Sequence, residues 1–351
     1  MSRFLLVGCF LVDTLYYHVV RCDTRLVVIF IQTTTGKAVF MFNVLSDYQK
    51  KFVVFIFVSM LLSACGGGGE SASTPSLWTK QVSTVVTNLN AVTKGAGSNL
   101  VAVGASGTII TSADAISWVS QISGTTNNLN GVIWNGTQFV AVGASGTILT
   151  SVDGVTWSSQ ISGTTDDING ISWNGSKFVA VGGVSTSTAL SSVDGITWLV
   201  RTSTQPHAFR GITWTGSTFI IVGDAGTKIE TSDGFSWLIS NFGTTNDFNA
   251  ITSNGSNKVV SVGTAGTIFS TSDTLTWSSY TPPTNLTFYG VTWDGTKFVA
   301  VGANDTIFVS TDGSTWTNQL SVTAGNTLRG VTWNGSKLVA VGDAGDIRTS
   351  P

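Results

Sequence analysis

Cysteine and histidine are scarce in this chain. Its 351 residues include three cysteines, Cys9, Cys22 and Cys65, and two histidines. No cysteine follows position 65, so disulfide bonds are not expected to stabilise the fold of the remaining chain. His207 is the one histidine after that position, which excludes a histidine-rich zinc site and disfavours a Ser-His-Asp triad. We therefore expect no metal and no cofactor.

Charged residues are also few, at 10% of the chain. After Cys65 the acidic residues outnumber the basic ones, so the sequence has no basic surface of the kind that binds nucleic acid. What is abundant instead is glycine, with 40 residues, and tryptophan, with 12. Together with frequent Thr, Ser and Val, this composition indicates short strands and tight turns.

A secretory signal is predicted at residues 41–64. Lys50 and Lys51 precede an apolar run, residues 52–62, that only Ser59 interrupts. A basic segment, a short apolar segment and small residues before the cleavage point are typical of such a signal. The run is too short for a comfortable membrane span.

The signal ends in Leu62-Ser63-Ala64-Cys65, which resembles the lipobox of bacterial lipoproteins. The resemblance implies cleavage before Cys65 and diacylation of its sulfur, and hence export and lipid anchoring to the cell envelope; two acyl chains give stable anchoring. Gly66 follows the cysteine, which by the same resemblance implies the outer membrane in a Gram-negative cell. The alternative is an ordinary signal peptide with an incidental cysteine. Residues 65–76 are rich in Gly and Ser and predict a flexible tether.

Residues 1–40 do not fit this organisation, because a secretory signal belongs at the start of a chain. Apolar stretches at residues 4–7 and 26–31 precede the signal. Our hypothesis is that translation starts at Met41 and that residues 1–40 are a mis-assigned extension. The alternative is an additional membrane segment. Detection of a peptide from residues 1–40 in cells by mass spectrometry would contradict the hypothesis.

Residues 77–351 consist of one unit repeated about every 40 residues, a period that indicates a propeller or a solenoid. The opening segment, Leu-Asn-Gly-Val or a variant, begins near residues 89, 129, 168, 209, 248, 287 and 328. The units close on Trp78, Trp118, Trp157, Trp198, Trp237, Trp277 and Trp316. Both series have seven members, so seven blades are predicted.

Each unit predicts four short strands, named a to d. In the third copy, strand a is residues 169–173 and strand b is residues 178–182, joined by the turn Asn174-Gly175. Asn-Gly favours a two-residue type I′ hairpin. Strand c resembles residues 147–151, and strand d starts at the closing Trp. No segment has helical periodicity, so we expect an all-β, seven-bladed β-propeller with four antiparallel strands per blade.

The two ends of the repeat region are complementary. Residues 77–81 form a lone strand d, and the last copy stops after strand c at residues 349–351. Pairing of these two strands would close the ring and remove two exposed sheet edges. A solenoid would not need this matched fragment.

Aspartate recurs between strands c and d, as in Ser151-Val-Asp-Gly-Val-Thr-Trp157. This segment resembles the Asp-box (BNR-like) hairpin of sialidase-type and sortilin-type propellers, although Gly directly follows Asp and shortens the turn by one residue. Together with the recurring Gly-x-x-Gly-Thr-Ile, it is also similar to the propeller family of photosystem II assembly factors. An Asp in a tight turn accepts backbone N–H groups, so a structural role is favoured over catalysis or metal binding. The six residues are Asp114, Asp153, Asp194, Asp233, Asp273 and Asp312.

Tryptophan at the same position in every copy favours packing between blades over sugar stacking, since burying one Trp gives roughly 4–6 kcal/mol of gross stabilisation. Five more tryptophans fall on strand a and are expected to pack in the same way: Trp134, Trp173, Trp214, Trp293 and Trp333.

Catalysis has little support. A sialidase needs an arginine triad and a Tyr/Glu pair, whereas the repeats hold four arginines and a single glutamate, Glu230. No Gly-x-Ser-x-Gly, His-Glu-x-x-His or EF-hand pattern is present. Paired carboxylates for glycoside hydrolysis remain an alternative because Asp is plentiful.

One position at the start of strand a is expected to line the mouth of the central channel, because strand a is innermost in a propeller. Departures from a repeat consensus are where function can reside, since packing does not require them; ordinary surface drift is the alternative. Two arginines among these departures would suit an anionic group such as a carboxylate or phosphate. The position holds Asn90, Asn130, Asn169, Arg210, Asn249, Tyr289 and Arg329.

The sequence therefore predicts a monomeric, non-catalytic lipoprotein whose propeller binds an envelope protein or ligand, or serves in assembly. One alternative is a surface propeller that binds or hydrolyses glycans. Another is an assembly factor like the photosystem family, which would copurify with a membrane complex.

Overall fold

The structure is a computed structural model, and it describes residues 5–6, 11–12, 15–22, 26–33, 38–44, 78–97, 99–202, 206–280, 282, 284–320 and 325–350. The chain divides into two compact units, residues 1–72 and 73–351. The predicted signal beyond Val44 and the predicted tether with Cys65 lie outside the described residues. No helix in the described part of the chain has the length and apolar character needed to cross a membrane.

The first unit contains one antiparallel sheet with strand order β1-β3-β4-β5, in which β2 also pairs with β3. Its strands are β1 (Leu5–Leu6), β2 (Leu11–Val12), β3 (Leu15–Cys22), β4 (Leu26–Thr33) and β5 (Ala38–Val44).

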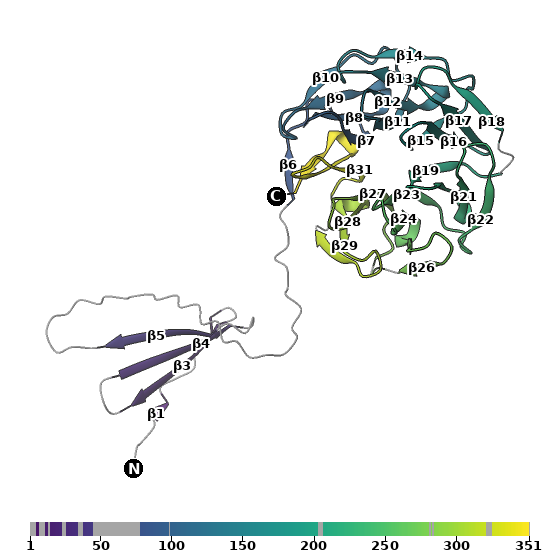
Figure 1. Cartoon of the computed structure of the whole chain (residues 1–351). Coiled ribbons are helices and arrows are strands. Elements are labelled where there is room, and N and C mark those ends of the chain that lie inside the picture. Colours follow the sequence, from purple (N-terminus) through teal and green to yellow (C-terminus); the bar gives the residue numbers. More distant parts are fainter. Residues whose placement is uncertain are drawn as a thin grey trace. The chain divides into compact units, whose positions relative to one another are not determined.

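The second unit is a seven-bladed β-propeller, as predicted (Figure 1). It consists of seven four-stranded antiparallel sheets, and in each sheet the strands follow the order a-b-c-d from the centre outward. We number the blades 1 to 7 along the chain, starting from the blade whose strand a is β7.

The innermost strands a are β7 (Leu89–Lys94), β11 (Leu129–Trp134), β15 (Ile168–Trp173), β19 (Phe209–Trp214), β23 (Phe248–Ser253), β27 (Phe288–Trp293) and β31 (Leu328–Trp333). Strands b are β8 (Leu100–Gly104), β12 (Phe139–Gly143), β16 (Phe178–Gly183), β20 (Phe219–Gly223), β24 (Val259–Gly263), β28 (Phe298–Gly302) and β32 (Leu338–Gly342). Strands c are β9 (Ile109–Ser112), β13 (Ile148–Ser151), β17 (Ser187–Ser192), β21 (Thr227–Thr231), β25 (Ile268–Thr271), β29 (Ile307–Ser310) and β33 (Ile347–Thr349).

The outermost strands d are β10 (Val119–Gln121), β14 (Ser158–Gln160), β18 (Leu199–Thr202), β22 (Leu238–Asn241), β26 (Trp277–Tyr280), β30 (Thr317–Leu320) and β6 (Thr79–Gln81). In every blade except blade 3, a short 3-10 turn links strands b and c. These turns are η1 (Ala105–Gly107), η2 (Ala144–Gly146), η3 (Asp224–Gly226), η4 (Thr264–Gly266), η5 (Ala303–Asp305) and η6 (Asp343–Gly345).

The burial of strand b between neighbouring blades explains the repeated Phe-Val-Ala-Val-Gly sequence. All five residues of β12 are buried, whereas β14 at the rim of the same blade is largely exposed. A strand that packs against neighbouring blades on both faces needs a continuous apolar run rather than an alternating one. No side chain fits at the final glycine, because a Cβ on Gly143 would lie 2.1 Å from the carbonyl oxygen of Asn128.

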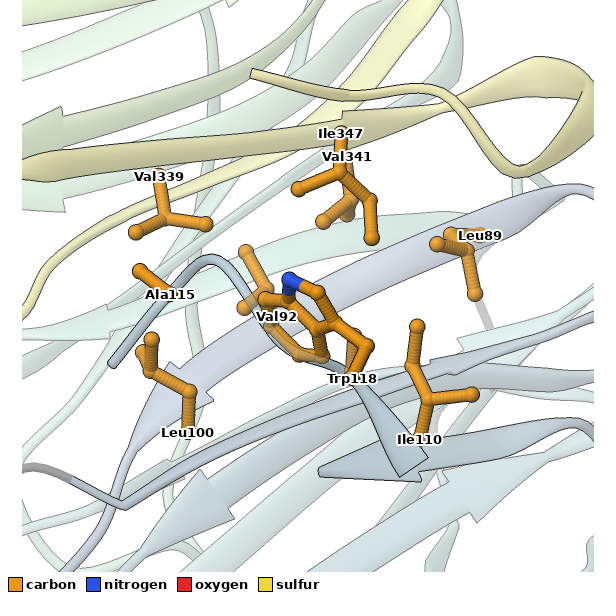
Figure 2. Close-up of a cluster of buried hydrophobic side chains, with 10 residues drawn as sticks. Leu89, Val92, Leu100, Ile110, Ala115, Trp118, Val339, Val341 and Ile347 are labelled. Atoms are coloured by element: carbon orange, nitrogen blue, oxygen red, sulfur yellow. The ribbon is translucent and has the colours of Figure 1, made fainter. Parts of the chain in front are cut away.

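Each junction between neighbouring blades contains a cluster of buried apolar side chains. Trp118 is only 3% exposed and lies at the centre of one such cluster, which supports a core role for the closing tryptophan. Figure 2 shows this cluster, where side chains of blade 7 face those of blade 1: Val339, Val341 and Ile347 opposite Leu89, Val92, Leu100, Ile110 and Trp118.

The seventh sheet combines strands from both ends of the propeller, in the order β31-β32-β33-β6. Thr79 lies opposite Thr349, and Gln81 lies opposite Ile347. The Gln81 side-chain amide also donates a 2.8 Å hydrogen bond to Oγ1 of Thr349. The outermost strand of this blade therefore comes from the N-terminal side of the unit.

Strand direction sorts the connections onto two faces. Trp134 pairs with Phe139 and Phe139 pairs with Ser151, so the a–b turn and the c–d turn of blade 2 lie at the same end. Neighbouring blades are joined there, because Nζ of Lys177 donates to the carbonyl oxygen of Asp233 at 2.8 Å. We call this the turn face. The opposite end, with the b–c loops and d–a connections, is the mouth face.

Candidate binding site at the channel mouth

The structure brings together all seven residues that the sequence assigned to the channel mouth. They line one cavity of about 420 Å³, together with Asn88, Ala105 and Asn128. The seven residues are Asn90, Asn130, Asn169, Arg210, Asn249, Tyr289 and Arg329.

A β-bulge in each strand a explains why these side chains turn inward. In β11 the pairing with β12 shifts between Leu129 and Gly131, so Asn130 has no partner in the ladder. The same shift occurs at the equivalent residue of all seven strands a. A bulge leaves its extra residue unpaired and redirects that side chain. The repeat thus presents one side chain per blade to the mouth.

The four asparagines at this position tie neighbouring blades together. Each Nδ2 donates to the backbone carbonyl at the start of the next strand a. The distances are 2.9 Å from Asn90 to Leu129, 3.1 Å from Asn130 to Ile168, 2.9 Å from Asn169 to Phe209 and 2.8 Å from Asn249 to Phe288. A net contribution of about 1 kcal/mol for each hydrogen bond is typical. These asparagines therefore have a structural reason to recur.

Arg210 replaces the asparagine in blade 4 and has two acidic neighbours. Its Nε donates to Oδ1 of Asp224, the first residue of η3. Its Nη2 lies 3.7 Å from Oδ2 of Asp247 in the connection to blade 5. The side chain remains 41% exposed, so this arginine is accessible from the channel.

Arg329 occupies the same position in blade 7 and has a matching partner. Its Nε is 2.5 Å from Oδ1 of Asp343, and its Nη2 is 3.3 Å from Oδ2. The guanidinium also lies over the ring of Tyr289 from blade 6, at 5.3 Å from the ring centre, within the range of a cation–π interaction. Blades 6 and 7 thus form a joined aromatic and charged surface at the mouth.

The acidic partners of the two arginines argue against the anion-binding site that the sequence suggested at the mouth. Asp224, Asp247 and Asp343 balance the two arginines, so a ligand does not meet an unpaired positive charge. Sequence reasoning missed this pairing, although a signal was present. Asp224 and Asp343 occur only in the two copies that carry Arg, 14 residues after it; the corresponding loop residues of other blades are Ala105, Ala144, Gly183, Thr264 and Ala303.

The six recurring aspartates lie on the turn face, away from the mouth. In blade 2, Oδ1 of Asp153 accepts the N–H groups of Val155 and Thr156, both at 2.8 Å, and a 2.9 Å hydrogen bond from Ser151. The turns of Asp114, Asp194, Asp233, Asp273 and Asp312 repeat this arrangement. In the first turn, backbone N–H donors lower the pKa of Asp114 to about 2. This geometry supports a structural role.

Other charged residues are also engaged in the fold. Glu230, the one glutamate of the repeats, pairs with Lys228 at 2.7 Å. Sequence reasoning missed a buried group in blades 6 and 7, where Nη2 of Arg348 lies 2.7 Å from Oδ2 of Asp305 and 3.3 Å from Oδ2 of Asp346. Burial raises the pKa of Asp305, and the charge of Arg348 opposes that effect. In the described part of the chain, no three His, Cys, Asp or Glu residues are grouped to hold a metal.

The fold and this site define a closed β-propeller with a polar channel mouth. No protein-family model matches the chain, and no curated protein sequence matches it. Solved propellers do match its structure. YCF48 bound to D1 peptide is 14% identical with a TM-score of 0.65, covering 80% of this chain and 96% of that one.

Two further matches have similar values. YCF48 from Cyanidioschyzon merolae is 14% identical with a TM-score of 0.61, covering 78% of this chain and 98% of that one. The β-propeller domain of Cps50 (Swd1) from Myceliophteria thermophila is 12% identical with a TM-score of 0.63, covering 78% and 99%. At these identities the likeness establishes the fold alone.

Proposed function

We propose that this chain is an exported lipoprotein, attached to the cell envelope through Cys65, whose propeller binds a protein segment at the channel mouth. One observation carries the proposal. Seven bulged positions converge on one cavity, and three of them carry Arg or Tyr in place of the asparagine that joins the blades.

Stability does not account for these departures. The Arg210 and Arg329 side chains are 41% and 32% exposed, and exposed ion pairs contribute about 0–1 kcal/mol. Each replaces an asparagine that would make an inter-blade hydrogen bond of similar value. Because the substitutions give the fold little, binding is the better reason for them.

The chemistry of the mouth suits a peptide. The two guanidinium groups can donate their remaining N–H groups to backbone carbonyls of a partner, and the three carboxylates beside them can accept its N–H groups. Tyr289 adds an aromatic surface beside Arg329. A cavity of about 420 Å³ lies within the range of ligand sites and would hold a few residues of a chain. The propeller solved with a D1 peptide gives further support for a protein partner.

The test is crosslinking in intact membranes followed by purification of the full chain. The variant Arg210→Ala/Arg329→Ala removes two positive charges from the mouth. Lys297→Ala/Lys337→Ala removes two from the turn face of blades 6 and 7 and is the matched control. We expect a specific protein partner to be lost with the first variant and retained with the second. Equal recovery of every partner from both would overturn binding at the mouth.

The lipid attachment is tested separately. The unaltered chain should incorporate labelled palmitate and fractionate with membranes, whereas Cys65→Ser should do neither. A Cys65→Ser variant that remains acylated would contradict the assignment. Turnover of an envelope polysaccharide by the purified protein, abolished by changing an aspartate outside the six turns, would replace the binding proposal with a glycan-cleaving one.

A further inference from the structure

The chain enters the propeller on the turn face. Trp78 precedes β6 as Trp157 precedes β14, and Thr79 pairs with Thr349 as Ser158 pairs with Thr150. The position of Trp78 is therefore equivalent to that of the other closing tryptophans, next to the c–d turns. A membrane attachment upstream of Trp78 is therefore connected to the propeller at the turn face and not at the mouth face.

The distance to the predicted attachment point is short. Twelve residues separate Cys65 from Trp78, and a Gly/Ser-rich chain of that length has an average extension of about 20 Å. Strand b alone, with five residues, is about 17 Å long, before the turns at either end are added. A tether of this length favours an orientation in which the turn face, rather than the mouth face, is near the point of attachment.

The turn face also exposes apolar side chains on five consecutive blades. In blades 1 to 5 the second residue after the turn aspartate is between 47% and 81% exposed, and the bonds of the turn use its backbone N–H and not its side chain. These residues are Ile116, Val155, Ile196, Phe235 and Leu275. Val152 and Val193, which precede the aspartate, are 73% and 67% exposed. Grouped apolar exposure of this kind marks an interaction surface.

Lysines accompany these apolar residues. Within these blades, Lys94 ends strand a of blade 1, and Lys177 and Lys258 directly precede strand b of blades 3 and 5. Nζ of Lys177 lies over the ring of Phe235 at 4.4 Å, and the guanidinium of Arg201 lies over it at 3.9 Å. Apolar groups bordered by long cationic side chains suit the boundary between lipid headgroups and acyl chains. The mouth face has exposed apolar residues too, such as Ile122 and Ile161, but the described chain enters the propeller on the other face.

We propose that the turn face of blades 1 to 5 rests on a lipid surface, so that the channel mouth faces away from the membrane. The proposal rests on the lipid attachment of Cys65 given above. It assigns the anchor and the binding site to opposite faces, which leaves the mouth open to a partner in the aqueous compartment.

The test places an environment-sensitive fluorophore on one face at a time. In the full chain with Cys9 and Cys22 replaced by serine, a single cysteine is introduced as Ile196→Cys on the turn face or Ile122→Cys on the mouth face. The labelled protein is reconstituted into phosphatidylcholine/phosphatidylglycerol vesicles that contain nitroxide-labelled lipid. We expect several-fold stronger quenching at position 196 than at position 122. In protein that is bound to the vesicles, equal quenching, stronger quenching at position 122, or none at either would overturn the proposal.

A second form separates this result from the fate of the anchor. Cys65→Ser with a hexahistidine insertion directly before Gly66 is held on the same vesicles by nickel-chelating lipid, so acylation is not needed. The same contrast between positions 196 and 122 is expected. Failure of the form with the unaltered Cys65 to reach membranes, while this form shows stronger quenching at position 196 than at position 122, would contradict the lipid attachment of Cys65 and support the lipid-facing role of the turn face. Protection of position 196 in cells without quenching by lipid would assign that face to a protein instead.

Discussion

The turn face and the mouth face are built from the same repeat, yet the copies agree on one face and differ on the other. On the turn face, six aspartates accept the same two N–H groups of their own turns. On the mouth face, the bulged residue of strand a is Asn in four blades and Arg or Tyr in three. The aspartates recur because each turn needs an acceptor for its backbone N–H groups. A departure from the repeat at the mouth is informative because no turn there needs such an acceptor.

The residues of the mouth also divide into a structural group and a variable group. Asn169 bonds to the carbonyl oxygen of Phe209 in the next blade, so its role is structural. Arg329 makes no such bond in the described structure and instead pairs with Asp343 and Tyr289. Variants at these positions should therefore separate the residues that hold the ring together from those available to a partner.

The largest effect is expected from deletion of residues 76–82, because both faces depend on one closed ring. The deletion removes β6 and Trp78, which is 8% exposed, and leaves the edge of β33 unpaired. The loss should be several kcal/mol, a large part of the net stability of about 5–15 kcal/mol of a typical domain. Circular dichroism should show one cooperative transition at a much lower Tm. Deletion of residues 67–73 is the control, and an unchanged melting curve for the 76–82 deletion would contradict closure by this strand.

The next effect concerns the turn face. Asp312 accepts N–H groups of Ser314 and Thr315, both at 2.7 Å, in the manner of a helix cap. Asp312→Ala should destabilise the propeller by about 1–2 kcal/mol, the usual cost of losing such an acceptor. Chemical denaturation of this variant beside Lys337→Ala, on the same face, provides the measurement. A loss no greater than that of the lysine variant would argue against a structural role.

A smaller and reciprocal effect should separate the two kinds of mouth residue. Asn169→Ala should cost about 1 kcal/mol of stability through the lost inter-blade hydrogen bond, with partner binding retained. Arg329→Ala should leave Tm nearly unchanged, because its ion pair is partly exposed to solvent and contributes little, and should abolish partner recovery. Melting curves and crosslinking of both variants test this together. The reverse assignment of effects would break the distinction.

The smallest effect is a dependence on acidity at the turns. Backbone N–H donors lower the pKa of Asp114 from 3.8 to about 2. A depressed pKa in the folded state contributes stability above the unfolded value, and this contribution is lost as pH falls from about 4 towards 2. Asp114→Asn should therefore show a shallower fall of Tm across that interval than the unaltered protein. An equal or steeper fall would contradict the inferred role of the N–H donors.

The fold could be predicted from the sequence because each repeat contains the apolar runs and turn residues of four strands, and the number of copies equals the number of blades. The place of the seven mouth residues followed as well, since strand a is innermost. The bulge that turns Asn130 inward could not be predicted, because it depends on a pairing shift with β12. The bond between Arg329 and Asp343 was also missed, because the two residues meet only when strand b and η6 fold back onto strand a.

The buried group of Asp305, Asp346 and Arg348 escaped prediction for a related reason. Its members come from two blades, and nothing local in the sequence marks them as neighbours. Composition predicts which residues are charged, but only the packing of blade 6 against blade 7 brings these charges together.

Binding of a protein partner at the mouth can be detected with a photo-crosslinking amino acid placed at single positions of the full chain in living cells. Tyr289 is replaced on the mouth face, and Ser256 on the turn face serves as the comparison. We expect a discrete protein adduct from position 289 that disappears when Arg210→Ala/Arg329→Ala is added, and no such adduct from position 256. The same adduct from both positions, or a protein adduct from position 256 alone, would contradict binding at the mouth.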